Sequence, residues 1–205
     1  MEVELHEVAK RYRFEWIFKN ISYSFLPGKR YAVLGNNGTG KSTLLRILSG
    51  HLTPSKGKII FSQNGKPLEI DQVYRKVAYA APYIDLIEEF TLKEAIDFHQ
   101  KFKPLLNNLN TKQVIELLGF EKSTDKSVKF FSSGMKQRLK LALAMVSQSS
   151  ILLLDEPTTN LDQQGMSWYQ ELLRTYAGNR LVIIASNIEA DYQACDHFLN
   201  IMDYK

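Results

Sequence analysis

The sequence predicts an α/β fold whose core is a mostly parallel β-sheet. Short aliphatic runs such as Ile151–Leu154 and Leu181–Ala185 alternate with segments of helical character in the last third of the chain. Fully apolar strands separated by helices are typical of a parallel sheet that is buried on both faces. A further apolar run, Arg30–Leu34, leads directly into a glycine-rich loop, which favours a strand–loop–helix unit at the core of the fold.

Size and composition indicate one globular domain over residues 1–205, or one domain with a small lobe. The chain is 44% hydrophobic and 23% charged, which is close to ordinary globular usage. Its longest unbroken apolar stretch, Leu141–Val146, is far shorter than the roughly 20 residues that span a bilayer. The single cysteine, Cys195, excludes an internal disulfide and fits a reducing compartment. The net charge of +4 is too balanced to indicate a nucleic-acid partner, and we expect none.

The first third of the chain predicts strands. Apolar residues alternate with polar ones over residues 21–25, and Pro27-Gly28 then turns the chain. A strand over Arg30–Leu34 follows, and another over Lys58–Ser62 is closed by an Asn64-Gly65 turn. Val77–Ala81 is expected to be a buried strand.

The middle of the chain predicts helices. A capping box at Thr91-Leu-Lys-Glu94 opens a helix that runs to about Phe102, where Pro104 stops it. A second helix is expected over Thr111–Leu118, and a third begins near Ser132. This helical insert, about residues 83–146, interrupts the sheet and is expected to form a separate lobe. After it we expect a helix over about Asp162–Tyr176 and a closing strand over His197–Met202.

A phosphate-binding loop follows the strand at Arg30–Leu34. Residues 35–42 match the motif G-x-x-x-x-G-K-[ST] between a predicted strand and a predicted helix, as the motif requires, and these flanks make a chance match rarer. Its glycines allow backbone N–H groups to turn inward, and the helix start presents its positive dipole end to an anion. Lys41 can neutralise β- and γ-phosphates, and Ser42 can ligate Mg²⁺. The candidate nucleotide-binding residues are Gly35, Asn36, Asn37, Gly38, Thr39, Gly40, Lys41, Ser42 and Thr43.

Two carboxylates lie at the carboxyl end of the aliphatic strand Ile151–Leu154. This edge is where ligands bind in open α/β sheets. Asp155 is placed to hold the Mg²⁺ shell, and Glu156 is placed to orient or deprotonate an attacking water. The alternative, a pair of solvated acids at a strand end, is less favoured because the phosphate loop lies upstream.

Further motifs carry a family resemblance. The segment Phe131–Arg138 resembles the signature of ATP-binding cassette (ABC) proteins, and Glu156–Asp162 resembles their D-loop. Tyr12 lies where that family keeps an aromatic residue that stacks on adenine. The resemblance covers nearly the whole chain. It implies an ABC ATPase of the P-loop NTPase class, with an ATP-binding core, an N-terminal antiparallel β lobe and a helical lobe.

The resemblance also implies how two chains would meet. Family members pair head to tail with two ATP molecules between them, so each chain holds half of each site. The signature's Ser132 can cap a helix and Gly134 can let backbone N–H groups approach an anion, here the γ-phosphate bound on the opposite subunit. The resemblance therefore implies a homodimer or a heterodimer, formed through the nucleotide sites, with ATP and Mg²⁺ as cofactors.

Three departures from the family pattern stand out. The signature carries Ser133 and Met135 where the family usually has glycine and glutamine. Asn187 occupies the place of a switch histidine, and Pro82 that of a glutamine that touches Mg²⁺ and water. Asparagine can donate a hydrogen bond to phosphate but cannot carry a proton or positive charge. The catalytic candidates are Glu156, Lys41 and Asn187. Because of Asn187 and Pro82, we expect the chain to bind Mg–ATP well and, at least alone, to hydrolyse it slowly.

The leading functional prediction is the ATPase subunit of a transporter. The family resemblance implies a separate integral membrane subunit that docks on the helical lobe, and a cytoplasmic location at the inner face of the cell membrane. The residues of the signature at 133–137 resemble those of simple export-type cassettes more than those of solute importers. Two alternatives stay open: a soluble ABC ATPase acting on ribosomes or DNA, and a structural subunit that uses ATP to hold a dimer with little hydrolysis.

Overall fold

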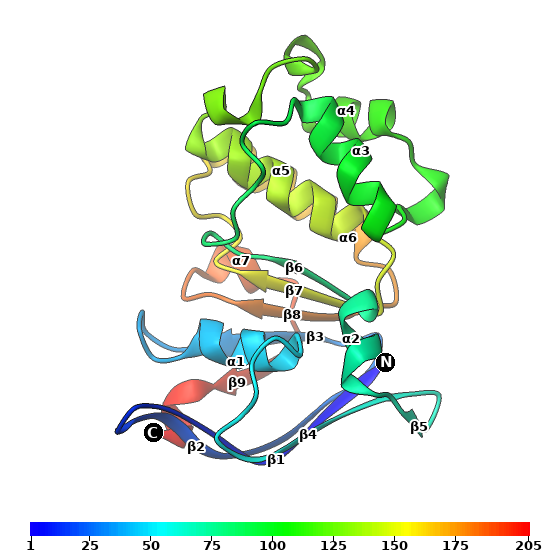
Figure 1. Cartoon of the computed structure of the whole chain (residues 1–205). Coiled ribbons are helices and arrows are strands. Elements are labelled where there is room, and N and C mark those ends of the chain that lie inside the picture. Colours follow the sequence, from blue (N-terminus) through cyan, green and yellow to red (C-terminus); the bar gives the residue numbers. More distant parts are fainter. The chain divides into compact units, whose positions relative to one another are not determined.

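A computed structural model describes residues 1–205 and divides them into two compact units (Figure 1). The first unit comprises Met1–Tyr79, Ser149–Glu156 and Gly178–Lys205. The second comprises Ala80–Gln148 and Pro157–Ala177. The helical insert expected at about residues 83–146 falls within the second unit, which also holds a later helix outside that range. No helix in the structure combines the length and the apolar character that crossing a membrane would require.

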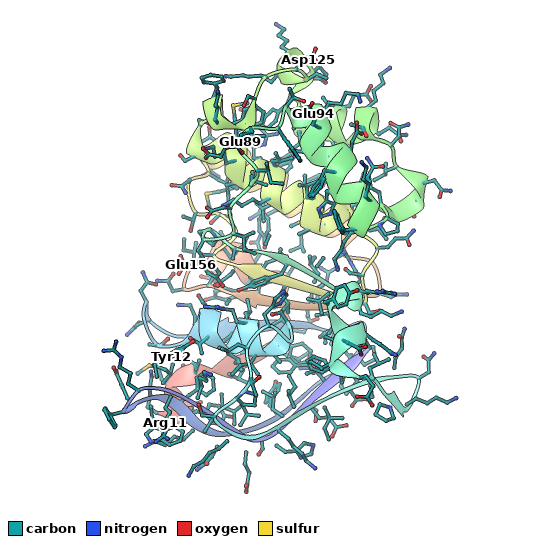
Figure 2. All side chains as sticks on the ribbon, in the orientation of Figure 1. Arg11, Tyr12, Glu89, Glu94, Asp125 and Glu156 are labelled. Carbon is teal, nitrogen blue, oxygen red and sulfur yellow. The ribbon has the colours of Figure 1, made fainter.

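An antiparallel sheet in the first unit has the strand order β2-β1-β4-β5. Its strands are β1 (Glu2–Tyr12), β2 (Glu15–Phe25), β4 (Lys56–Gln63) and β5 (Lys66–Pro67). The alternation at residues 21–25 lies in β2, where Ile21 and Phe25 are buried and the serines between them are exposed. The Asn64-Gly65 turn is also confirmed, because both residues have positive φ angles (53° and 74°), as a tight hairpin turn requires. Arg11 and Tyr12 lie near the end of the β1–β2 hairpin (Figure 2).

The second sheet of this unit has the order β6-β7-β8-β3-β9. It comprises β6 (Val77–Ala80), β7 (Ile151–Asp155), β8 (Leu181–Ala185), β3 (Arg30–Leu34) and β9 (His197–Asn200). The strands β7, β8, β3 and β9 pair in parallel, so the expectation of a mostly parallel core is confirmed. Because these strands run parallel, the loops that follow β3, β7 and β8 lie at one edge of the sheet.

The closing strand is shorter than expected. It ends at Asn200, and a 3-10 helix, η4 (Ile201–Tyr204), follows where the sequence predicted strand as far as Met202. The side chain of Asn200 accepts a hydrogen bond from the Met202 N–H at 3.1 Å. This local bond offers the backbone an alternative to continuing the ladder, which is why the strand stops there.

The core of the first unit joins both sheets through α1 (Lys41–Leu48). In Figure 1 this helix lies between the parallel strands and the antiparallel sheet. Its buried residues Leu44, Leu45, Ile47 and Leu48 share one hydrophobic cluster with residues of both sheets. Two short helices of this unit, α2 (Ile70–Lys76) and α7 (Glu189–Tyr192), were not expected from the sequence.

The second unit is built from four main helices, which are α3 (Leu92–Phe102), α4 (Thr111–Leu118), α5 (Ser133–Val146) and α6 (Gln163–Tyr176). Short 3-10 helices connect them at η1 (Leu106–Asn108), η2 (Glu121–Ser123) and η3 (Val128–Phe130). The ends of α3 and α4 agree with the sequence-based expectation. Apolar residues of α3, α4 and α5 share a core of their own, which includes Leu92, Ile96, Val114, Leu118, Leu139 and Val146.

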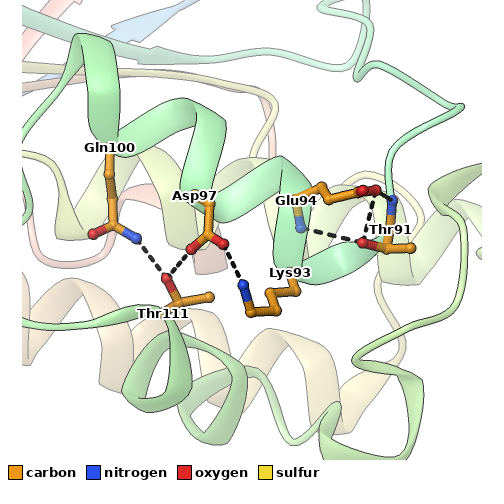
Figure 3. Close-up of polar contacts among 6 residues, drawn as sticks. All are labelled: Thr91, Lys93, Glu94, Asp97, Gln100 and Thr111. Carbon is orange, nitrogen blue, oxygen red and sulfur yellow. Dashed lines mark hydrogen bonds and ion pairs between the residues drawn. The ribbon is translucent and has the colours of Figure 1, made fainter.

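Polar contacts fix the start of α3 and tie it to α4 (Figure 3). Thr91 accepts from the Glu94 N–H at 3.2 Å, and the Glu94 carboxylate accepts from the Thr91 N–H at 2.8 Å, which completes the predicted capping box. One turn later the Asp97 carboxylate accepts from both Lys93 and the Thr111 hydroxyl. These bonds lower the pKa of Asp97 below its usual range and link the start of α4 to the middle of α3.

Candidate functional site

The glycine-rich loop between β3 and α1 forms a concave turn with unusual backbone angles. Gly35, Gly38 and Gly40 have φ angles of 144°, 77° and 106°, a region that residues with a Cβ rarely adopt. A Cβ on Gly35 would lie 2.7 Å from the Ile201 side chain, and one on Gly40 would overlap Ile17. The space around Gly38 is open, so glycine is favoured there because of the positive φ angle and not because of a close neighbour.

The start of α1 leaves its backbone donors uncapped. Gly40 is the N-cap residue, it has no side chain to accept a hydrogen bond, and the first turn carries no acidic residue. Free N–H groups and the positive end of the helix dipole together favour a bound anion. The neighbouring Asn36, Asn37 and Gly38 are exposed, and Ser42 and Thr43 are half-buried.

Lys41 places a positive charge inside this turn. Its side chain is only 4% exposed, and its ammonium donates to the carbonyl oxygens of Gly35 at 2.7 Å and Asn36 at 3.2 Å. A buried ammonium is stabilised by such acceptors, and a phosphate oxygen would be a stronger one because it carries charge. The loop therefore has the geometry and charge to hold a polyphosphate.

Asp155 and Glu156 follow β7 at the same sheet edge. Asp155 is 1% exposed and accepts from the Tyr79 hydroxyl at 3.4 Å. Glu156 is half-buried with φ 43°, and its N–H donates to the carbonyl of Ala185 at 2.8 Å. A non-glycine residue in this region is strained, and such strain clusters at functional sites.

The residues fit a hard cation such as Mg²⁺. The Ser42 hydroxyl and the Asp155 carboxylate are oxygen donors of the kind that this ion prefers. In the strand order, only β8 separates β3, which precedes the loop, from β7, which carries Asp155. At about 4.8 Å between neighbouring strands, roughly 10 Å separates the axes of β3 and β7, a span that a phosphate tail with its cation can cross.

The strand between them, β8, ends at Ala185 and is followed by Ser186 and Asn187. Ser186 is fully buried, and its hydroxyl donates to Asp191 and accepts from the Ile188 N–H at 3.0 Å. These bonds fix the turn in which Asn187 sits, while the Asn187 side chain itself is exposed. A neutral amide therefore stands at the edge where β3 and β7 also end.

Tyr12 lies on the same side of the first unit as Glu156, the side toward which the arrowheads of β7 and β8 point (Figures 1 and 2). The residue is 44% exposed, and the Lys10 ammonium lies 5.4 Å from the ring centroid. Tyr12 pairs with Glu15 across the hairpin. An exposed aromatic face of this kind can stack on a planar base.

The signature-like segment opens α5 in the second unit. Ser132 is the N-cap, and its hydroxyl accepts from the Met135 N–H at 3.2 Å. A Cβ on Gly134 would lie 2.9 Å from the carbonyl oxygen of Asn160. Sequence reasoning assigned Gly134 to the approach of an anion, whereas the structure gives it a second reason, the close passage of another backbone segment.

That second segment is the D-loop-like stretch, which is packed against α5. Gln137 is buried, and its side-chain amide donates to the carbonyl of Pro157 at 2.9 Å. Asp162 caps α6 by accepting from the Gly165 N–H at 2.7 Å. A pocket of about 340 Å³ lies between the two segments and is lined by Phe120, Ser132, Ser133, Gly134, Met135, Arg138, Asn160, Leu161 and Asp162.

Two further features of the second unit bear on the sequence expectations. Pro82 follows β6 and presents only its carbonyl as a polar group, which accepts from the Lys140 ammonium at 2.7 Å. A groove of about 230 Å³ is lined by Asp85, Leu86, Ile87, Phe90, Ala95, Phe98, His99, Phe102 and Leu143.

The sequence analysis did not single out Tyr79 of the first unit, whose hydroxyl donates to Asp155. The available signal was a polar hydroxyl in an otherwise apolar strand.

A family model described as ABC transporter matches residues 18–159, well over half of the chain. The chain belongs to the ABC transporter family. The ABC transporter ATP-binding protein YybJ of Bacillus subtilis, itself described as uncharacterized, is 31% identical over 197 residues, which cover 95% of this chain and 89% of that protein. The Nod factor export ATP-binding protein I of Rhizobium johnstonii is 30% identical over 95% of this chain and 64% of that longer protein.

The fold is also that of solved ABC cassettes. The ATP-binding cassette MJ0796, in a dimeric post-hydrolysis structure with ADP and Pi, superposes with a TM-score of 0.84 at 20% identity, covering 97% of this chain and 94% of that one. The predicted P-loop ABC fold is thereby confirmed. The cassette is an ATP-binding subunit of the ABC transporter type, in a family whose members bind and hydrolyse ATP.

Proposed function

We propose that this cassette binds Mg–ATP in the loop Gly35–Thr43, hydrolyses it, and drives a separate membrane subunit that exports a substrate. The observation that carries the proposal is the buried Lys41 ammonium inside an uncapped, positive-φ loop. Loop amides and Lys41 would hold the phosphates, and Tyr12 would stack on the adenine. The export direction is supported by the names of the Nod factor export relatives.

Ser42 and Asp155 would hold Mg²⁺, which supplies positive charge to the β- and γ-phosphate oxygens. Glu156 would orient the attacking water and accept its proton, since it follows the buried strand that ends in Asp155. The fixed turn at Ser186 would aim the Asn187 amide as a hydrogen-bond donor to the γ-phosphate.

The signature would complete the site of a second chain. Ser132 and Gly134 lie at the start of α5, whose N-terminal N–H groups and dipole favour an anion. In a head-to-tail homodimer or heterodimer they would meet the γ-phosphate bound on the partner. ATP would then hold the two chains together, and hydrolysis would release them.

The membrane subunit would dock on the groove between α3 and the segment that follows Pro82. Phe102, Ile87 and Phe98 are 70%, 43% and 38% exposed there. The Phe98 and Phe102 rings lie 5.0 Å apart, and the Phe90 and Phe98 rings 5.3 Å apart. An apolar, aromatic groove fits the apolar face of a short helix, which would keep the cassette at the inner face of the cell membrane.

We further propose that this chain hydrolyses ATP slowly. Slow hydrolysis favours a second candidate function, a subunit that uses ATP mainly to hold a dimer. Asn187 and Pro82 are the observations on its side, because neither supplies the group that its position usually provides. ATP turnover with and without the membrane subunit separates the two candidates. A large stimulation by the partner supports the transport motor, whereas unchanged low turnover supports the structural subunit.

Substitution of Lys41 tests the nucleotide site. Lys41→Ala removes a charged donor to phosphate, worth about 1.5–3 kcal/mol, so Mg–ATP should bind roughly tenfold to a hundredfold more weakly. Isothermal titration calorimetry measures this, with Lys66→Ala on the exposed strand β5 as the matched control. Equal affinity of Lys41→Ala and the parent, or no Mg–ATP binding by the parent, contradicts the proposal.

Substitution of Phe102 tests the docking groove. Phe102→Asp places a charge on an apolar contact and should abolish co-purification with the membrane subunit while leaving Mg–ATP affinity unchanged. Phe130→Asp is the control, since Phe130 is similarly exposed at 63% in the same unit but lies outside the groove. If both variants retain the partner equally well, the groove is not the docking site.

A further inference from the structure

One lysine joins the phosphate loop to the antiparallel sheet. The ammonium of Lys205 donates to the carbonyl oxygens of Ile17 and Thr39, each at 2.8 Å. Ile17 belongs to β2, and Thr39 lies in the glycine-rich loop. A single charged donor therefore bridges two backbone segments that lie far apart in the sequence, and both acceptors are main-chain groups.

The contact lies where the loop is already packed from behind. Ile201, in η4, lies where a Cβ on Gly35 would clash, and Ile17 lies where one on Gly40 would clash. Thr39 is 8% exposed, and its N–H and hydroxyl both donate to the carbonyl of Asn36 at 3.3 and 2.7 Å. The loop residue that Lys205 holds is thus bonded on both sides.

The bond between Lys205 and the Thr39 carbonyl bears on anion binding by the loop. The Thr39 carbonyl oxygen is held by Lys205, and fixing this peptide group favours one backbone arrangement of the loop, which anion binding through N–H groups requires. Charge-assisted bonds are stronger than bonds between neutral groups. The same ammonium also anchors β2, which forms the hairpin that carries Tyr12.

We propose that Lys205 is a positioning residue that holds the phosphate loop in its anion-binding shape and in register with the Tyr12 hairpin. This inference rests on the proposed binding of Mg–ATP to that loop. In this role Lys205 acts through its bonds to Thr39 and Ile17, and it need not touch the nucleotide itself. It differs in this from Lys41, whose ammonium lies within the loop.

The test compares Lys205→Met, which keeps the length but loses the charge, with Lys205→Arg and with the control Lys66→Met on β5. We expect Lys205→Met to weaken Mg–ATP binding about threefold to thirtyfold, the loss expected for a charged hydrogen bond that acts indirectly. Lys205→Arg should recover most of the affinity, and Lys66→Met should bind like the parent. Hydrogen–deuterium exchange over residues 35–41 of the nucleotide-free protein should be faster in Lys205→Met alone.

Three results would overturn the inference. They are parental affinity and exchange in Lys205→Met, a loss of affinity that arginine does not repair, or a lower unfolding temperature with unchanged affinity. The last would mean that Lys205 only stabilises the fold. If the parent itself fails to bind Mg–ATP, the proposed function fails, and the exchange measurement still decides whether Lys205 orders the loop.

Discussion

At the scale of single residues, the charge and hydrogen-bonding capacity of individual side chains determine what the phosphate-binding edge can do. Lys41 is buried against two loop carbonyls, so its charge needs an anion or these acceptors. Asn187 stands on a turn that Ser186 fixes through Asp191 and the Ile188 N–H. A rigid turn with an amide at its tip can donate one hydrogen bond, but it cannot supply the charge of an imidazolium.

Asn187→His should raise ATP turnover. One preorganised donor to developing charge is worth about 10²–10³ in rate, so we expect an increase of about tenfold to a hundredfold over a slow parent. Steady-state phosphate release measures it, and Asn187→Ala serves as the comparison, expected to be no faster than the parent. An unchanged rate in Asn187→His would mean that the missing histidine does not limit turnover, and a fast parent would contradict slow hydrolysis itself.

At the scale of elements, α5 and the segment before α6 behave as one piece. Gly134 permits the carbonyl of Asn160 to approach, and the Gln137 amide bonds the carbonyl of Pro157. The Arg138 guanidinium also donates to the carbonyl of Leu118, the last residue of α4, at 2.7 Å. A shift of the signature helix would therefore move the D-loop-like segment and the end of α4 with it.

Gly134→Ala should destabilise the protein through this contact. The added methyl group would lie 2.9 Å from the Asn160 oxygen, and overpacking of this kind costs about 1–3 kcal/mol. Urea unfolding should show a lower midpoint than in the parent. Ser133→Ala, at the exposed neighbouring position, is the control and should unfold like the parent. A Gly134→Ala midpoint equal to that of Ser133→Ala would show that the segment around Asn160 moves away from the added methyl group at no cost in stability.

At the scale of the whole molecule, a half-buried histidine, His99, makes stability depend on pH. The His99 ring nitrogen lies 2.7 Å from the Ser147 hydroxyl, and burial together with the nearby Lys103 charge lowers the pKa of His99 to about 4. Its pKa when unfolded is about 6.5. The unfolded chain therefore binds the proton more readily between these values, and folding stability falls as the pH drops from about 6.5 to 4.

The expected loss is about 2–3 kcal/mol across that interval, since one pKa unit corresponds to about 1.4 kcal/mol. Denaturant unfolding at several pH values between about 7 and 4.5 measures it. His99→Gln, which cannot titrate, should flatten the dependence, whereas His6→Gln on the exposed hairpin should leave it as in the parent. If His99→Gln shows the same slope as the parent, another group is responsible.

Several local features of the fold, including the backbone of the phosphate loop, were predictable from short stretches of sequence. Glycine spacing, the Thr91–Glu94 capping box and the Asn64-Gly65 turn depend on a few consecutive residues, and each has the predicted geometry. The end of the last strand was missed because Asn200 forms a local bond that composition does not reveal. The short helix α2 was also missed, because its only buried residue is Val73 and it carries little apolar periodicity.

Residues near in sequence were enough to predict the backbone of the phosphate loop, most of the strands and helices, and the family, because backbone conformation and capping are local properties. Long-range packing alone determined that Gly134 faces Asn160, that Tyr79 bonds Asp155, and that Lys205 joins Thr39 to Ile17. These contacts unite segments separated by tens of residues. Only the folded arrangement of sheets and helices brings such groups within hydrogen-bonding distance, so no local pattern encodes them.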